Sequence, residues 1–398
     1  TATATAAPAA PPAAGAAPAA PANWYDKFAA DAFVDAYGAV DWNFPKPQGA
    51  PLNGPVKLRA FDTAQGFSLN WIGLNGSYAA DPIGGTISLR FGPGAVTYHG
   101  SPLVLGASSS INPSDSSIGL QNVRQAYATW KPADKVTLDF GKFDQPYGSE
   151  VPDSQLNMEY TRSLLFTLNQ PVFFTGFRLD YAPTDTFDAK LIVANGWNNS
   201  IDNNRAKSFG AQVSFKPADS LQLYLGYMAG PEQVDVQTVA AGTPPMMTSA
   251  HVADANSHWR HLVDLVVDFN PTKEFRLLLN GDYDTEEKVG ATGDHAAIWY
   301  GANLALRYIV ADPFQITLRG EYFHDEHGDI LGTGTSTNVE SGTLTLQYVI
   351  ASHLALMLDN RIDVADTNTI FYKSAFTSPD DATKTQFTTT LGVIASTK

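Results

Sequence analysis

The residues that could do chemistry are charged side chains placed at every second position of long apolar segments. In FRLLLNGDYD, for example, Arg276 and Asp282 alternate with Phe275, Leu277 and Tyr283. Successive side chains of a β-strand point to opposite faces, so charged residues at this spacing share one face. The residues expected on this face are Asp31, Asp35, Arg178, Asp180, Arg276, Asp282, Arg307, Arg319, Glu321, Asp359 and Arg361. Around a water-filled space they would either pair and hold the wall in shape or set up a field that selects ions.

Motifs for catalysis or metal binding are few. The chain has no Cys, which excludes disulfides, thiolate metal sites and Cys nucleophiles, and G-x-S-x-G and H-E-x-x-H are missing. FHDEHGD (323–329) could bind a divalent ion, but no second cluster fixes a geometry, so we interpret it as an acidic surface loop. NNSIDNN (198–204) lacks the spaced acids of a calcium loop. We therefore predict no enzymatic activity, no cofactor and no metal site.

The elements that carry the charged residues are predicted to be β-strands that cross a membrane. From Phe28 onward the dominant period of apolar residues is two, and the segments run for about 9–13 residues, the length of a tilted strand that crosses a bilayer. Strands of a soluble β-sandwich centre nearer five or six residues. No run of apolar residues is long enough for a membrane-spanning helix.

Short and long connections alternate between these strands. Short, Pro- or Asp-bearing turns are predicted at 79–82, 131–135, 182–186, 216–220, 270–274, 310–313 and 350–353. Long polar connections are predicted at 43–66, 93–118, 145–171, 197–206, 229–259, 285–296, 326–338 and 364–384. This asymmetry is typical of an outer-membrane barrel, with short periplasmic turns and longer outer loops. It predicts an all-β fold, an antiparallel transmembrane barrel of about sixteen strands with a lumen wide enough for water.

Aromatic residues precede nearly every short turn, as a girdle at the lipid headgroups requires. They are Tyr78, Trp130, Tyr181, Phe215, Phe269, Tyr308 and Tyr348. A sparser second girdle is expected from Phe91, Tyr227, Tyr283 and Tyr322.

The segment 145–171 is a candidate constriction of the barrel. Its charged residues are Glu150, Asp153, Glu159 and Arg162. They accompany Leu164, Leu165 and Phe166, an apolar cluster that an outward loop would hardly favour. Two arrangements remain open, one in which the segment folds into the lumen and one in which it covers the mouth.

Composition limits the partners. A net charge of −15 argues against nucleic acid, because phosphate binding needs a basic surface, and favours cations over anions in a channel. Residues 1–22, rich in Ala and Pro, are predicted to form a separate tail before the barrel of residues 23–398. This tail could lie free in the periplasm or contact a periplasmic partner.

Residues 157–198 resemble the OmpL-like beta-barrel porin family of bacterial outer membranes. The matching positions are Tyr160, Thr161, Arg162, Ser163, Thr175, Gly176, Arg178, Asn195, Gly196 and Trp197. The resemblance implies a passive channel in the outer membrane. The chain departs from the usual aromatic C-terminus, since Phe387 lies well before Lys398. Either the closing signal is weaker, or the last residues extend past the barrel.

We therefore predict an outer-membrane porin that lets small hydrophilic solutes or ions diffuse through a charged lumen. The alternatives are a barrel sleeve that holds a partner protein in the membrane, and a surface protein that binds through its loops. Outer-membrane lipid is the expected surrounding. A homotrimer is expected by analogy, with the small residues Ala30, Ala32, Ala36 and Gly38 of the first strand at the subunit contact.

Overall fold

The computed structural model describes most of the predicted barrel. The described residues are 23–45, 65–99, 119–233, 255–289, 295–351, 353–368, 370–373 and 381–397. The predicted tail, residues 1–22, lies outside them, as do large parts of the connections predicted at 43–66, 93–118 and 229–259.

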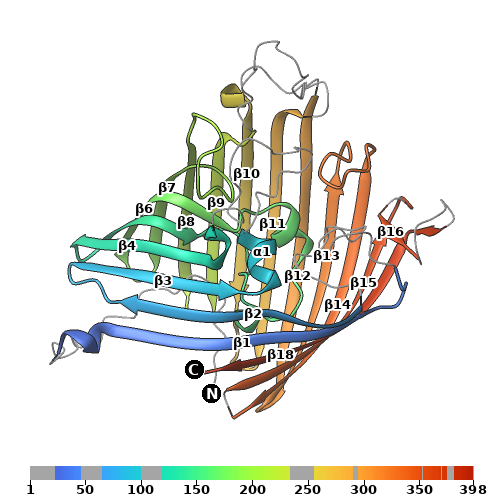
Figure 1. Cartoon of the computed structure of the whole chain (residues 1–398), viewed down its shortest axis with the longest axis horizontal. Coiled ribbons are helices and arrows are strands. Elements are labelled where there is room, and N and C mark those ends of the chain that lie inside the picture. Colours follow the sequence, from blue (N-terminus) through green and yellow to red (C-terminus); the bar gives the residue numbers. More distant parts are fainter. Residues whose placement is uncertain are drawn as a thin grey trace.

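Sixteen antiparallel strands form one closed barrel (Figure 1). The strands are β1 (Phe28–Asp41), β2 (Gln65–Tyr78), β3 (Ile83–Phe91), β4 (Val123–Ala133), β5 (Val136–Asp144), β6 (Phe173–Thr184), β7 (Phe187–Ala194), β8 (Ser208–Ala218), β9 (Leu221–Pro231), β10 (Trp259–Phe269), β11 (Phe275–Val289), β12 (His295–Ala311), β13 (Phe314–Asp325), β14 (Thr337–Ile350), β15 (Leu354–Ala365) and β18 (Thr385–Ser396). Each strand pairs with its neighbours along the chain, and β1 closes the ring against β18. The predicted fold class and strand number are confirmed.

Short elements lie in the connections. The helices are α1 (Pro93–His99) and α3 (Leu164–Leu168), with 3-10 turns η1 (Trp24–Lys27), η2 (Leu120–Asn122), η3 (Ser154–Leu156) and η4 (Ala255–Ser257). A two-stranded sheet of β16 (Phe371–Tyr372) and β17 (Ala382–Thr383) lies between β15 and β18. None of the described helices has the length and apolar character needed to span a bilayer.

Apolar side chains point outward and polar ones inward. Leu318 and Leu344 face each other across β13 and β14 and are 54% and 38% exposed. Their sequence neighbours Arg319 and Thr343 are both buried on the inner side. The alternation expected from the sequence is therefore present, with an apolar surface toward lipid.

The predicted turns and girdles also form. The connections 134–135, 185–186, 219–220 and 312–313 are even shorter than predicted, because the strands extend further into them. The rings of Trp130, Tyr181, Phe215, Tyr308 and Tyr348 are exposed beside these turns, and those of Phe91, Tyr227, Tyr283 and Tyr322 are exposed toward the other strand ends.

The last strand reaches almost to the end of the chain. Ser396 pairs with Phe33 of β1, and the backbone N–H of Thr397 donates to the carbonyl of Ala32 at 2.9 Å. Of the two alternatives for the C-terminus, the one in which the last residues extend past the barrel is wrong. Hydrogen bonding to β1 keeps them in the sheet.

Replacing Leu318 by Arg tests the outward apolar face. A charge near the middle of a lipid-facing strand should lower the free energy of unfolding by about 2–4 kcal/mol. Val310→Arg, on an exposed residue beside the turn 312–313, should cost about 1 kcal/mol or less. Urea titration in lipid vesicles, followed by tryptophan fluorescence, measures both, and an equal cost at the two sites would contradict the assignment.

Candidate functional site

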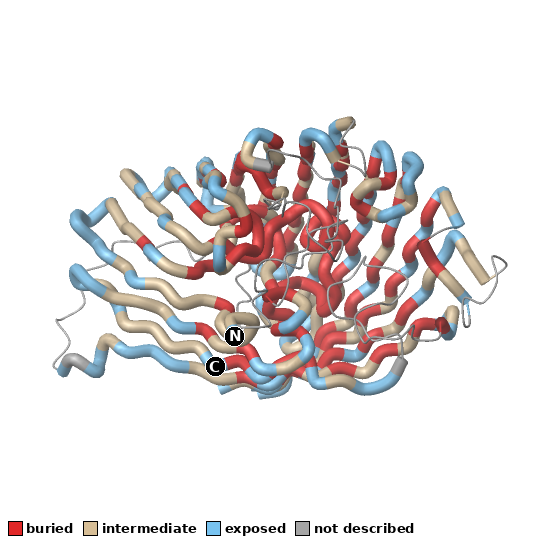
Figure 2. The backbone as a smooth tube through the Cα atoms, turned by 45° about the horizontal axis from the view of Figure 1, so that its top comes forward, coloured by how far each residue is buried: buried red, intermediate tan, exposed pale blue. Residues whose placement is uncertain are grey.

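The connection between β5 and β6, residues 145–172, lies inside the barrel. The five residues of α3 are all buried, and the side chain of Ser163 caps this helix by accepting from the N–H of Phe166 at 3.1 Å. Figure 2 shows a group of buried segments in the middle of the ring of strands. Of the two arrangements predicted for this segment, the structure has the inward one.

Strands far around the ring hold the backbone of this connection. The N–H of Gly148 donates to Asp264 of β10 at 3.1 Å. The N–H of Thr161 donates to Asp359 of β15 at 2.7 Å, and both groups are buried. Buried amide groups need partners, and here carboxylates of the barrel wall supply them.

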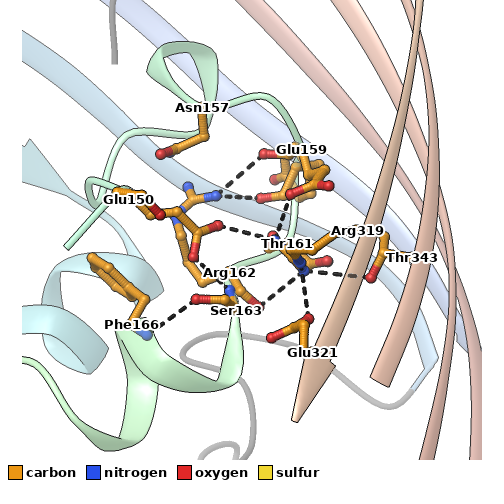
Figure 3. A network of polar contacts seen from close by, with 12 residues as sticks. Glu150, Asn157, Glu159, Thr161, Arg162, Ser163, Phe166, Arg319, Glu321 and Thr343 are labelled. Atoms are coloured by element: carbon orange, nitrogen blue, oxygen red, sulfur yellow. Dashed lines mark hydrogen bonds and ion pairs between the residues drawn. The ribbon is translucent and has the colours of Figure 1, made fainter. Parts of the chain in front are cut away.

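Arg319 of β13 is the centre of a charged network (Figure 3). Its guanidinium lies 3.0 Å from the Glu150 carboxylate and 2.6 Å from that of Glu159, both in the inward connection. It also lies 2.8 Å from Glu321 on its own strand, and its side chain is only 1% exposed. Removing one member of a buried ion pair costs about 3–5 kcal/mol, so this network fixes the connection to the wall.

Two further arginines shape the connection itself. Arg162 donates to the backbone carbonyls of Val151, Pro152 and Tyr160 at 2.7–3.0 Å. Arg361 of β15 donates to the carbonyl of Arg162 at 2.7 Å. Since Arg162 is fully buried and bonded to its own loop, it holds the shape of the connection and has little contact with water.

Asp153 fastens the start of the connection to β3 and β4. Its carboxylate accepts from Arg90 at 3.0 and 2.7 Å and is also bonded by Arg124. Burial raises the pKa of Asp153, but Arg124 and Arg90 outweigh burial and hold this pKa below its usual value. The carboxylate is therefore a stable anchor.

Tyr160 docks against β1 and β18. Its hydroxyl donates to Asp35 at 2.8 Å, and Asn70 donates to the other oxygen of Asp35 at 2.7 Å. Gly392 of β18 lies against the Tyr160 ring, where an added Cβ would be 2.1 Å from the nearest ring atom. The wall therefore leaves space for the side chain that the connection inserts.

A group of acids on β10 and β11 has only neutral hydrogen-bond donors. Asp264 and Asp282 face each other across the two strands, and Asp284 follows on the same inner side. Gln170 of the inward connection donates to Asp282 at 2.7 Å, and Asn280 donates to Asp264 at 2.9 Å. Among the described residues, none of the three acids forms an ion pair with Lys or Arg.

The half of the barrel nearer the short turns carries paired charges. The pairs are Arg178–Asp139 at 2.7 Å, Lys190–Asp180 at 3.1 Å and Arg276–Asp268 at 2.8 Å. Arg307 lies opposite Arg276 across β11 and β12, and Asp31 accepts from Asn75 at 2.6 Å. These residues lie on the inner side of the sheet, and most of them form cross-strand pairs.

Sequence reasoning missed several members of the site. They are Arg90, Arg124, Asp139, Asp264, Asp284, Gln170 and Asn280. The alternation of their strands does place Asp264 and Asn280 on the polar face, since Asp264 recurs with Asp268 in HLVDLVVDF, but it did not mark them as site residues. Their partners lie far away in sequence, so no local pattern could have paired them.

A family model described as "Putative beta-barrel porin-2, OmpL-like" matches residues 27–396. The chain belongs to this family. It is therefore an outer-membrane β-barrel porin of bacteria. No curated protein matches the chain.

Solved outer-membrane proteins share the porin fold. The outer membrane channel DcaP of Acinetobacter baumannii has a TM-score of 0.59 at 12% identity over 93% of this chain and 96% of its own. OmpF of Salmonella typhi, in complex with daunomycin, has a TM-score of 0.58 at 13% identity over 94% and 99%. OmpT of Vibrio cholerae in a trimer form has a TM-score of 0.54 at 11% identity over 93% and 98%.

Replacing Gly392 by Val should displace the Tyr160 ring and loosen the inward connection of the porin. Overpacking of this kind costs about 1–3 kcal/mol. We expect a larger and noisier single-channel conductance in planar bilayers. Gly320→Val is the matched control, because a Cβ at Gly320 meets no atom within 4 Å. The same conductance for Gly392→Val and the wild-type porin would contradict this docking.

The pH dependence of the connection should follow Glu159. Burial, together with the neighbouring carboxylates of Glu150, Asp359 and Glu321, raises the pKa of Glu159 from 4.5 to about 8, although Arg319 lowers it. The Glu159 carboxyl therefore binds its proton more tightly when the connection is docked in the barrel than when the connection is released from the wall. This stabilisation is fully present below pH 4.5 and is lost as the pH rises through about 8.

Current noise of the wild-type channel should therefore increase between pH 7 and pH 9. Glu159→Gln, which stays neutral, should remove this increase, whereas Glu274→Gln in an exposed turn should keep it. An unchanged pH dependence in Glu159→Gln would show that another group is responsible.

Proposed function

We propose that this porin is a passive, cation-preferring channel for small hydrophilic solutes or ions, without covalent chemistry or energy coupling. The observation that carries the proposal is the excess of carboxylates around the inward connection. Buried Asp and Glu outnumber buried Lys and Arg among the described residues.

The acids on β10 and β11 are the main source of this bias. Asp264 and Asp282 face each other, and two facing carboxylates attract a proton or a cation between them. Amide donors from Gln170 and Asn280 orient these acids, and neither donor carries a positive charge. In a narrow space with low-dielectric walls, such charge favours cations and repels anions.

Size selection would come from the inward connection. Its buried apolar residues form dry contacts with the wall, as where Phe166 packs with Tyr98 and Trp71 in one cluster. Glu150, Asp153 and Glu159 lie in the same connection, and their pairs with Arg319 and Arg90 keep it in place against the wall. Solutes would pass by size and charge alone.

A homotrimer fits the outer face of β1. Ala32, Ala36 and Gly38 alternate with the buried Phe33 and Tyr37, so they face outward. Small side chains on an outer wall permit close approach of a second subunit, and one solved neighbour of the same fold is a trimer. Chemical crosslinking of the purified protein that yields only monomer would contradict this assembly.

Reversal potentials in a KCl gradient test the selectivity. The wild-type channel should prefer K⁺ over Cl⁻, and the double variant Asp264→Asn, Asp282→Asn should lose most of this preference. Asp219→Asn, in the exposed turn 219–220, is the control and should change nothing. Preference for Cl⁻ in the wild type would overturn the proposal.

The same bilayer experiment separates the channel from a sleeve around a partner protein. A folded barrel, verified by its heat-dependent mobility on a gel, should give discrete conductance steps. Silence from folded protein would contradict the channel and favour the sleeve.

A further inference from the structure

We propose that His295, His327 and Asp329 form a binding site for one divalent transition-metal ion, such as Zn²⁺, at the outer end of the barrel. One ligand atom from each of these residues lies within 4.8 Å of the other two. The Nε2 atom of His295 is 2.8 Å from Asp329 Oδ2, and the centroids of the His295 and His327 rings are 4.7 Å apart.

Two strands bring the three residues together. His295 is the first residue of β12, and the other two lie in the connection that follows β13, the strand paired with β12. The N–H of Glu326 donates to the carbonyl of Ile298 at 3.0 Å, which continues this pairing above the last ladder residues. The site is therefore part of the barrel rim.

The connection after β13 is built to hold its shape. The buried carboxylate of Asp325 accepts from four successive N–H groups, those of residues 328–331, at 2.8–3.1 Å. Gly328 has a φ of +73°, which a residue with a side chain rarely adopts, and Ile330 is buried in an apolar cluster with Trp299. His327 and Asp329 are thus presented from a fixed backbone.

The chemistry of the donors selects the ion. Two imidazoles and one carboxylate suit Zn²⁺, Ni²⁺ or Cu²⁺ better than Ca²⁺ or Mg²⁺, which prefer oxygen alone. Ligand atoms around tetrahedral Zn²⁺ lie about 3.4 Å apart, given bonds of about 2.0–2.1 Å. His327 is exposed and can turn toward the other two, and water can supply a fourth ligand.

The sequence interpretation of 323–329 as an acidic surface loop overlooked His295, which lies 34 residues before Asp329. His324 belongs to the same motif but is not among the three, and its Nδ1 donates to the amide oxygen of Asn338 at 2.8 Å. This difference provides a control within the motif.

Titration of metal-free, tag-free protein in detergent with ZnCl₂, followed by calorimetry, tests the site. We expect one Zn²⁺ per chain, and CoCl₂ should give the visible absorption of tetrahedral Co²⁺. His295→Ala, His327→Ala and Asp329→Asn should each weaken binding at least about tenfold, since even outer-shell changes cost about 10–100-fold. His324→Ala should bind within twofold of wild type.

Binding should also weaken on acidification, because protons compete with the metal for imidazole nitrogen. Absence of Zn²⁺ binding, or equal weakening by His324→Ala, would overturn the site. If His295→Ala fails to fold, the exposed His327→Ala decides alone, and wild-type affinity in that variant would overturn the proposal. The result is independent of the channel's selectivity, so either proposal can fail by itself.

Discussion

The structure depends on one constraint, that every backbone N–H and C=O within the hydrocarbon needs a hydrogen-bond partner. The chain meets it by closing β1 on β18, so that no strand edge faces lipid. Closure also forces side chains to alternate between lipid and lumen. The outward face can then be mostly apolar, while most of the buried charge gathers inside.

Gathering charge inside creates a second requirement, because buried ions need partners. Within the barrel, the wall and the connection between β5 and β6 satisfy each other. Arg319 forms ion pairs with acids of the wall and of the connection. Carboxylates of the wall accept hydrogen bonds from backbone N–H groups of the connection. The connection is therefore part of the interior, as a core helix would be in a soluble protein. Apolar contacts around α3 also attach it to the wall.

The charges are distributed unevenly around the lumen. Arginines and carboxylates pair closely on β3–β6 and on β13–β15, whereas Asp264, Asp282 and Asp284 of β10 and β11 have amide partners. Paired charges stabilise the shape of the wall, and under the proposed function the acids without such pairs bias the electric field in the lumen. One ring of strands can thus carry paired charges on some of its sides and acids without ion pairs on another.

The sequence by itself determined the strands, the turns and the direction of each side chain, because these follow from a period of two and from local Pro and Asp chemistry. Thus Arg319 and Asp359 were expected on the inner face and are found there. Tertiary structure decided which of these residues meet. Arg319 and Glu150 are 169 positions apart, and their contact depends on ring closure and on the path of an inward connection. His295 lies beside Asp329 because β12 pairs with β13, and the register between these strands is set by the whole barrel.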